Sequence, residues 1–157
     1  MGTNVYFSPG YFGTNDLGVF DTVRNLFSTV ASNGYTKGYY GAAAVGNTVY
    51  FVPNEYLKVG VLNVESKAFT EIDTSSDIQD SKYAGAVAVG KKVYMTPYEQ
   101  ETVGVLDTAT QKFSTIATTG LNTGFTSGRN YAVWRCMLID PIVIKRGHKW
   151  LELSDCN

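Results

Sequence analysis

The sequence contains few of the residues on which catalytic and metal sites depend. Its 157 residues include one histidine, His148, and two cysteines, Cys136 and Cys156. A single histidine excludes a His-rich metal site. We predict that the two thiols are unpaired, with a disulfide between them as the alternative. The phosphate-loop, nucleophile-elbow and zinc-protease motifs are also missing. The sequence therefore predicts no cofactor and no metal.

Charge and hydrophobicity exclude further classes. Thirteen Lys and Arg residues against 14 Asp and Glu give a net charge of -1, so no excess of basic residues attracts nucleic acid or an anionic membrane. No apolar run approaches the roughly 18 residues that span a bilayer. We predict neither nucleic-acid binding nor membrane insertion. The first residues lack the pattern of a signal peptide, and the chain has no Asn-X-Ser/Thr acceptor. Both features favour an intracellular location.

The sequence does contain an internal repeat, with three copies of one segment. The first part is a Val-Tyr strand that ends at a proline, and its copies are 5–9, 49–53 and 93–97. The second part centres on Gly-Val, and its copies are 17–21, 59–63 and 103–107. The third part begins with Phe, and its copies are 27–30, 69–72 and 113–116. The prolines stand at 9, 53 and 97, so the period is 44 residues, which is typical of propeller blades.

Each complete unit predicts four antiparallel strands. In the second unit we expect them at 40–45, 48–52, 58–62 and 68–72, with the small side chains of the first suited to a crowded propeller axis. Gly46-Asn47, like Gly90-Lys91 in the third unit, is a two-residue hairpin that needs positive φ. The polar stretch 107–112 is a turn between the third and fourth strands. No segment has a convincing helical period, so the fold class is all-β.

The pattern resembles the kelch-like β-propeller superfamily. The resemblance covers about residues 4–119, and 83–94, 103–107 and Phe113 carry it best. The double glycine of the kelch motif appears here as Gly41-Ala42 and Gly85-Ala86, and no fourth strand contains tryptophan. The resemblance implies a propeller-type fold of four-stranded blades.

We predict a single propeller-like domain over 1–157 with an incomplete ring. The blades are 4–34, which lacks an inner strand, 35–78 and 79–122, and residues 123–157 form a divergent tail or partial blade. Three arrangements remain open: two chains form a six-bladed ring, the chain is a subunit whose open edges dock on other proteins, or the tail completes a fourth blade. Within the tail, the basic run 145–149 is interpreted as a turn between strands at 142–145 and 150–153.

The topology predicts one rim as a candidate binding surface. Loops that follow the second strand of each blade open on the same side as the links between blades. The candidate binding residues there are Tyr11, Glu55, Tyr56, Tyr98, Glu99 and Gln100. Asn54 lies in the same loops, and Tyr39 and Tyr83 lie near the links. Aromatic rings beside carboxylates and amides suit a glycan, a peptide or a cationic group. The alternative is that the tyrosines simply cover the blade faces.

Because the repeat accounts for nearly every patterned residue, we predict a non-catalytic binding or scaffolding module rather than an enzyme. It would act through rim loops or open blade edges, with a protein partner or self-association, and as a subunit of a larger assembly. The alternative is a carbohydrate-active enzyme or lectin in which Glu55 and Glu99 act on a glycan.

Overall fold

The computed structural model describes residues 2–8, 16–32, 38–74, 82–98, 102–117, 143–146 and 149–152. All regular secondary structure in these ranges is β-strand, which confirms the predicted all-β class. Within the same ranges no helix has the length and hydrophobicity to cross a membrane.

The strands form three sheets in chain order and one separate hairpin. Blade 1 comprises β1 (Asn4–Phe7), β2 (Asp16–Asp21) and β3 (Leu26–Ala31). Blade 2 comprises β4 (Tyr39–Val45), β5 (Thr48–Pro53), β6 (Lys58–Asn63) and β7 (Phe69–Asp73). Blade 3 comprises β8 (Tyr83–Val89), β9 (Lys92–Pro97), β10 (Thr102–Asp107) and β11 (Lys112–Ala117). Every neighbouring pair is antiparallel, so each sheet is a meander.

The separate hairpin pairs β12 (Val143–Arg146) with β13 (Lys149–Glu152). The predicted strand pair is present, with three residues of the basic run in its strands, and residues 147 and 148 between the strands lie outside the described residues.

Both inner hairpins form as predicted, with one refinement. Gly46 and Gly90 have φ values of 56° and 58°, and Asn47 and Lys91 do not share this conformation. A positive φ at only the first central residue is the pattern of a type II′ turn, whose twist suits the flanking strands.

The outer hairpins of all three blades contain the same type of turn. The last residue of the strand before this hairpin accepts two backbone N–H groups on its side-chain oxygen, and a residue one or two positions before the next strand is left-handed. The accepting residues are Asp21, Asn63 and Asp107, at 2.9–3.0 Å. The left-handed residues are Asn25, Lys67 and Gln111. Asx turns of this kind order the hairpin without any tertiary contact.

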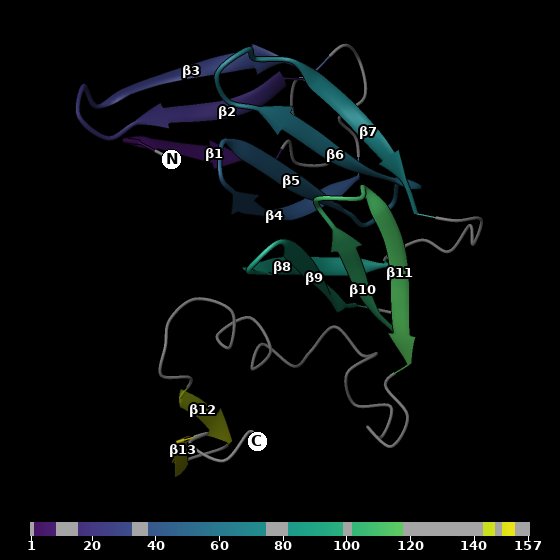
Figure 1. Ribbon diagram of the computed structural model, residues 1–157. Coiled ribbons are helices and arrows are strands. Elements are labelled where there is room, and N and C mark those ends of the chain that lie inside the picture. The colour runs from purple at the N-terminus through teal and green to yellow at the C-terminus, as the bar shows by residue number, and fades with distance from the viewer. Residues whose placement is uncertain are drawn as a thin grey trace.

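Blades 2 and 3 meet through their inner strands, and Figure 1 shows β4 and β8 side by side. A Cβ added at Gly41 would lie 3.1 Å from the Cα of Gly85, so the two backbones approach too closely for larger side chains. This confirms that the inner strands require small residues.

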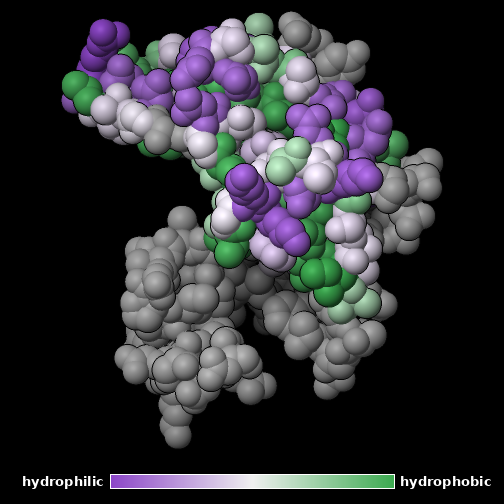
Figure 2. Space-filling view, in the orientation of Figure 1, coloured by the Kyte–Doolittle hydropathy of each residue, from purple (hydrophilic) through white to green (hydrophobic). Residues whose placement is uncertain are grey.

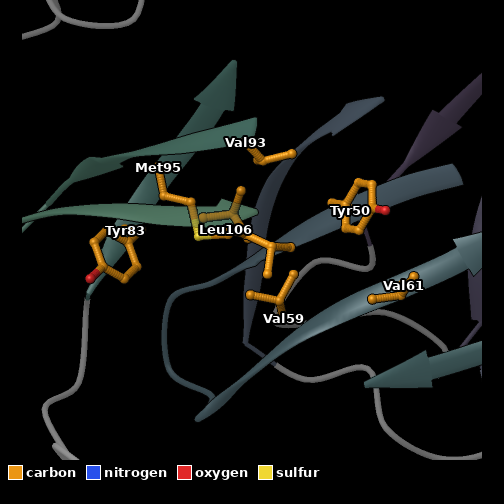
Figure 3. Packing of buried hydrophobic residues seen from close by; sticks show 8 residues of the cluster. Tyr50, Val59, Val61, Tyr83, Val93, Met95 and Leu106 are labelled. Carbon is orange, nitrogen blue, oxygen red and sulfur yellow. The ribbon is translucent and has the colours of Figure 1, made fainter. Parts of the chain in front are cut away.

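The core consists of two layers, each between a pair of blades. One layer joins Leu17 of blade 1 to Tyr39, Phe51, Leu62 and Phe69 of blade 2. The other joins one side of blade 2 to blade 3, and Figure 3 shows seven of its side chains by name, among them Tyr50 and Val59 from blade 2 and Met95 and Leu106 from blade 3. Alternate residues of β5 point to opposite layers because side chains along a strand alternate between its faces.

Blade 1 has three strands among the described residues, and β1 corresponds to the second strand of the repeat. Among the described residues β1 pairs with β2 alone, whereas the equivalent strands β5 and β9 each have two neighbours. The three blades follow one another around an arc (Figure 1), which is the predicted incomplete ring.

Candidate functional site

The predicted rim is real as a topological feature. The residues after β5 contact the start of β4, the inner strand of the same blade. The N–H groups of Asn54 and Glu55 donate to the Gly38 carbonyl at 2.7 and 3.1 Å. In the next blade Tyr98 repeats the first of these bonds, donating to the Lys82 carbonyl at 2.8 Å. Loops that follow the second strand therefore lie beside the starts of the inner strands, on one side of the array.

Asn54 itself is not available for binding, and its placement among the rim side chains is wrong. Asn54 is buried, and its side-chain Nδ2 donates to the backbone carbonyl of Tyr83 at 2.8 Å. The backbone carbonyl of Asn54 accepts the N–H of Lys82 at 3.0 Å. A buried amide that satisfies backbone groups of the next blade is a structural link between blades.

The described candidate residues differ in how much of each reaches solvent. Glu55 is exposed, and Tyr56 and Tyr98 are half-buried. The ring of Tyr56 packs edge-on against Tyr39, with 5.6 Å between centroids. Tyr11, Glu99 and Gln100 lie outside the described residues. Glycoside chemistry between Glu55 and Glu99 therefore stays a prediction.

Tyr39 and Tyr83 are core residues at the links between blades. Tyr39 packs edge-on against Phe69, and Tyr83 packs in the same way against Phe113, with centroids 6.4 and 6.2 Å apart. For these two rings the alternative interpretation holds, because they cover blade faces.

One ionic network distinguishes blade 2. The Tyr39 hydroxyl donates to Glu71 Oε1 at 3.3 Å, and Lys58 Nζ lies 3.8 Å from Glu71 Oε2 and 3.4 Å from Asp73 Oδ1. Burial raises the pKa of Tyr39 far above its ordinary range, and the negative charge of Glu71 adds to the rise. Tyr39 therefore stays a neutral donor. The lysine satisfies both carboxylates, and the network reads as a stabilising link between β6 and β7 rather than a reactive site.

The described residues contain no group of three or more His, Cys, Asp or Glu side chains placed to hold a metal ion.

The most unusual surface lies on blade 1. We call its face directed away from blade 2 the leading face of blade 1, formed by Val5, Phe7, Phe20 and Phe27. Val5, Phe7 and Phe27 are 43%, 47% and 64% exposed. Over the side of the molecule turned to the viewer in Figure 2, hydrophilic side chains dominate and hydrophobic ones form separate patches. The leading face thus carries three large exposed apolar side chains close together, and contiguous exposed apolar surface of this kind has functional meaning in soluble proteins.

The same positions are buried in blade 2. Val49, Phe51 and Phe69 occupy the places of Val5, Phe7 and Phe27, and they are 3%, 0% and 9% exposed. The difference arises from neighbours, not from residue type. Blade 2 is covered by Leu17 of blade 1 and by its own Tyr39, whereas no described residue covers blade 1 in this way.

The exposed rings are nevertheless ordered. Phe7 and Phe27 contact each other with centroids 6.1 Å apart, and Gly18 leaves room for them, since an added Cβ would lie 2.9 Å from the Phe27 ring. The leading face is thus a preformed aromatic surface. The leading face was not predicted from the sequence. The available signal was that Phe27 aligns with Phe69 at the first position of the third part of the repeat.

The fold resembles several solved structures. Hydrazine synthase of Kuenenia stuttgartiensis matches with a TM-score of 0.55 and 19% identity over 67% of this chain and 30% of that chain. The RRP9 WD40 repeats match with a TM-score of 0.52 and 16% identity over 66% and 31%. Apo AztD from Citrobacter koseri matches with a TM-score of 0.53 and 15% identity over 69% and 30%. This chain therefore spans about a third of the length of the structures that it matches.

A scan of family models gives no match to the sequence, and neither does a search of curated proteins. The structural likenesses establish a β-propeller type of repeat fold. They do not single out the kelch-like subtype.

Proposed function

We propose that this chain is a non-catalytic protein-interaction module that docks through the leading face of blade 1. The observation that carries the proposal is the pair Phe7 and Phe27, ordered against each other yet 47% and 64% exposed. Exposed contiguous apolar surface of this kind marks interaction sites, and aromatic side chains are enriched at their centres.

Two further facts support the proposal. The same residue positions already form an interface between blades 1 and 2, so the face has the shape of a surface that packs against protein. The fold also resembles the WD40 repeats of RRP9, and this likeness supports an interaction module. Both facts support a role that depends on contact with protein.

The kelch-like subtype remains part of the proposal, since the inner-strand segments 39–45 and 83–89 carry the small residues on which the resemblance depends. The rim stays a second proposed surface. Glu55 is exposed and Tyr98 is half-exposed, so both remain candidates to contact a peptide or glycan.

The test compares tagged wild-type chain with Phe27→Asp in cells that express it, by quantitative mass spectrometry of the proteins that co-purify. Lys112→Asp, which changes an exposed residue at the start of β11, is the matched control. Proteins that depend on the leading face disappear with Phe27→Asp and remain with the control. An identical set from all three proteins would refute docking through this face.

A further inference from the structure

Blade 3 has an open face of its own, on the side opposite to blade 2. We call it the trailing face of blade 3, formed by Val89, Tyr94, Val103 and Ile116. Val89 and Ile116 are 61% and 54% exposed, and Tyr94 and Val103 are half-buried. In blade 2 the equivalent residues are Val45, Tyr50, Val59 and Ile72, which belong to the layer that packs on blade 3.

We propose that the trailing face of blade 3 in one copy docks on the leading face of blade 1 in a second copy, head to tail. This inference rests on the proposed function and names its partner. Apart from the inner strand, which the described part of blade 1 lacks, the two open faces correspond to the two sides of the interface between blades 2 and 3.

The internal interfaces show what the contact would contain. Between blades 2 and 3, Val59 of one blade packs in one layer with Met95 and Leu106 of the next (Figure 3), and Val52 belongs to the same layer. The equivalent contact between copies would bring Val103 of blade 3 against Phe7 and Phe20 of the partner. Val103 matches Val59, and Phe7 and Phe20 stand where Met95 and Leu106 pack, whereas Thr96 replaces Val52.

A polar contact at the outer hairpins repeats in the same way. In each internal interface a tyrosine reaches the outer hairpin of the next blade: Lys67 Nζ lies 5.8 Å from the Tyr6 ring centroid, and the Tyr50 hydroxyl interacts with Thr108. Tyr94 is the equivalent residue of blade 3. Across the proposed contact it would face the blade 1 hairpin of the second copy, where Thr22 occupies the position of Thr108.

Symmetry favours a second copy over an unrelated occupant. Each copy has one leading face and one trailing face, so two copies can cover both open faces of each other. A different protein could cover one of these faces only with a blade of its own. Head-to-tail contacts close into a ring when the rotation allows. Two copies of the three blades that the structure describes give six blades, within the usual range of about four to eight for propellers.

The experiment uses two variants that each block one half of the contact. Phe27→Asp places a charge on the leading face, and Ile116→Asp places one on the trailing face; both side chains are exposed, so the blades still fold. Sedimentation velocity over a concentration series measures association of the wild type, each variant, and their mixture. The dissociation constant of each variant alone should be at least about 30-fold higher than that of the wild-type dimer, as expected for loss of a central contact.

The mixture is the decisive sample. In a head-to-tail contact the intact trailing face of Phe27→Asp meets the intact leading face of Ile116→Asp, so the mixture regains a dimer held by one interface. If the leading faces pair with each other instead, Ile116→Asp dimerises alone, and the proposal is overturned. Val5→Asp and Val89→Asp repeat the test at other positions of the same faces.

A wild-type chain that stays monomeric throughout the series also overturns the second-copy proposal. It leaves the proposed function standing if the co-purification test still depends on Phe27. Thermal unfolding of each variant shows that any loss of association comes from the contact and not from an unfolded chain.

Discussion

Phe27 and Phe69 occupy the same position of two successive blades, yet Phe27 is 64% exposed and Phe69 is 9% exposed. Each ring lies over the glycine of its neighbouring strand, Gly18 or Gly60. The two differ in what lies on the other side: Phe69 contacts Tyr39 and belongs to the layer against blade 1. The pair therefore offers a direct comparison between a closed and an open blade face.

That comparison gives the first prediction. Phe69→Ala should lower the free energy of unfolding by about 3–5 kcal/mol, because it removes a buried ring and leaves a cavity. Phe27→Ala should lower it by less than about 1 kcal/mol in dilute solution, since its ring is already largely in water. Urea unfolding of both variants measures the difference. Equal losses would show that the leading face is covered in the folded chain.

The buried amide of Asn54 gives the second prediction. Asn54→Ala removes the donor to the Tyr83 carbonyl and should cost about 1–3 kcal/mol of stability. Glu55→Ala, at the exposed neighbour, is the control and should change the thermal midpoint little. If both substitutions proved neutral, Asn54 would not link blades 2 and 3.

The glycines beneath the aromatic rings give the third prediction. A Cβ at Gly60 would lie 2.8 Å from the Phe69 ring and 3.0 Å from the Tyr39 ring, both of which are held in the core. Gly60→Ala should therefore destabilise the chain by about 1–3 kcal/mol. Gly18→Ala meets only the exposed Phe27 ring within 3 Å, and this ring has room to turn outward. Denaturant unfolding should show a smaller loss for Gly18→Ala, and a loss equal to that of Gly60→Ala would contradict the open face.

Acid sensitivity of the outer hairpins is the fourth prediction. The N–H of Thr110 holds the pKa of Asp107 below its usual value of 3.8, as the N–H of Arg24 does for Asp21. A carboxylate with a lowered pKa in the folded chain stabilises it above the unfolded value, and this contribution is lost as pH falls through the folded value. Stability should thus decline in acid below about pH 3.8.

Blade 2 supplies the control for that effect, because Asn63 makes the same turn with an uncharged amide oxygen. Asp107→Asn should keep the turn at neutral pH and unfold with a weaker dependence on acid. Urea midpoints at neutral and acid pH measure the slope. An unchanged slope would mean that the Asp107 turn does not contribute to it.

Much of the fold could be predicted from the sequence because it depends on local chemistry. Gly46 and Gly90 specify the inner hairpins through their φ values, and the Asp or Asn that ends each third strand specifies the outer ones. The repeat of these signals at a fixed period fixes the blade. The three-stranded first blade followed from the same count.

The binding surface could be predicted much less well, since it depends on neighbours. Asn54 has the composition of a rim residue but is consumed by a bond to the next blade. Phe27 looks like Phe69 in sequence and differs only because no described residue covers it. The repeat indicates which residues each blade face offers for packing. It does not indicate which blade face lacks a neighbouring blade.

The most direct test of the central claim, that the leading face of blade 1 is an open interaction surface, is hydroxyl-radical footprinting read out by mass spectrometry. In dilute solution Phe7 and Phe27 should oxidise severalfold faster than Phe51 and Phe69, their buried equivalents. Their oxidation should fall toward that of Phe51 and Phe69 as the chain binds its partner. Equal protection of all four rings in the dilute, monomeric chain would contradict the claim.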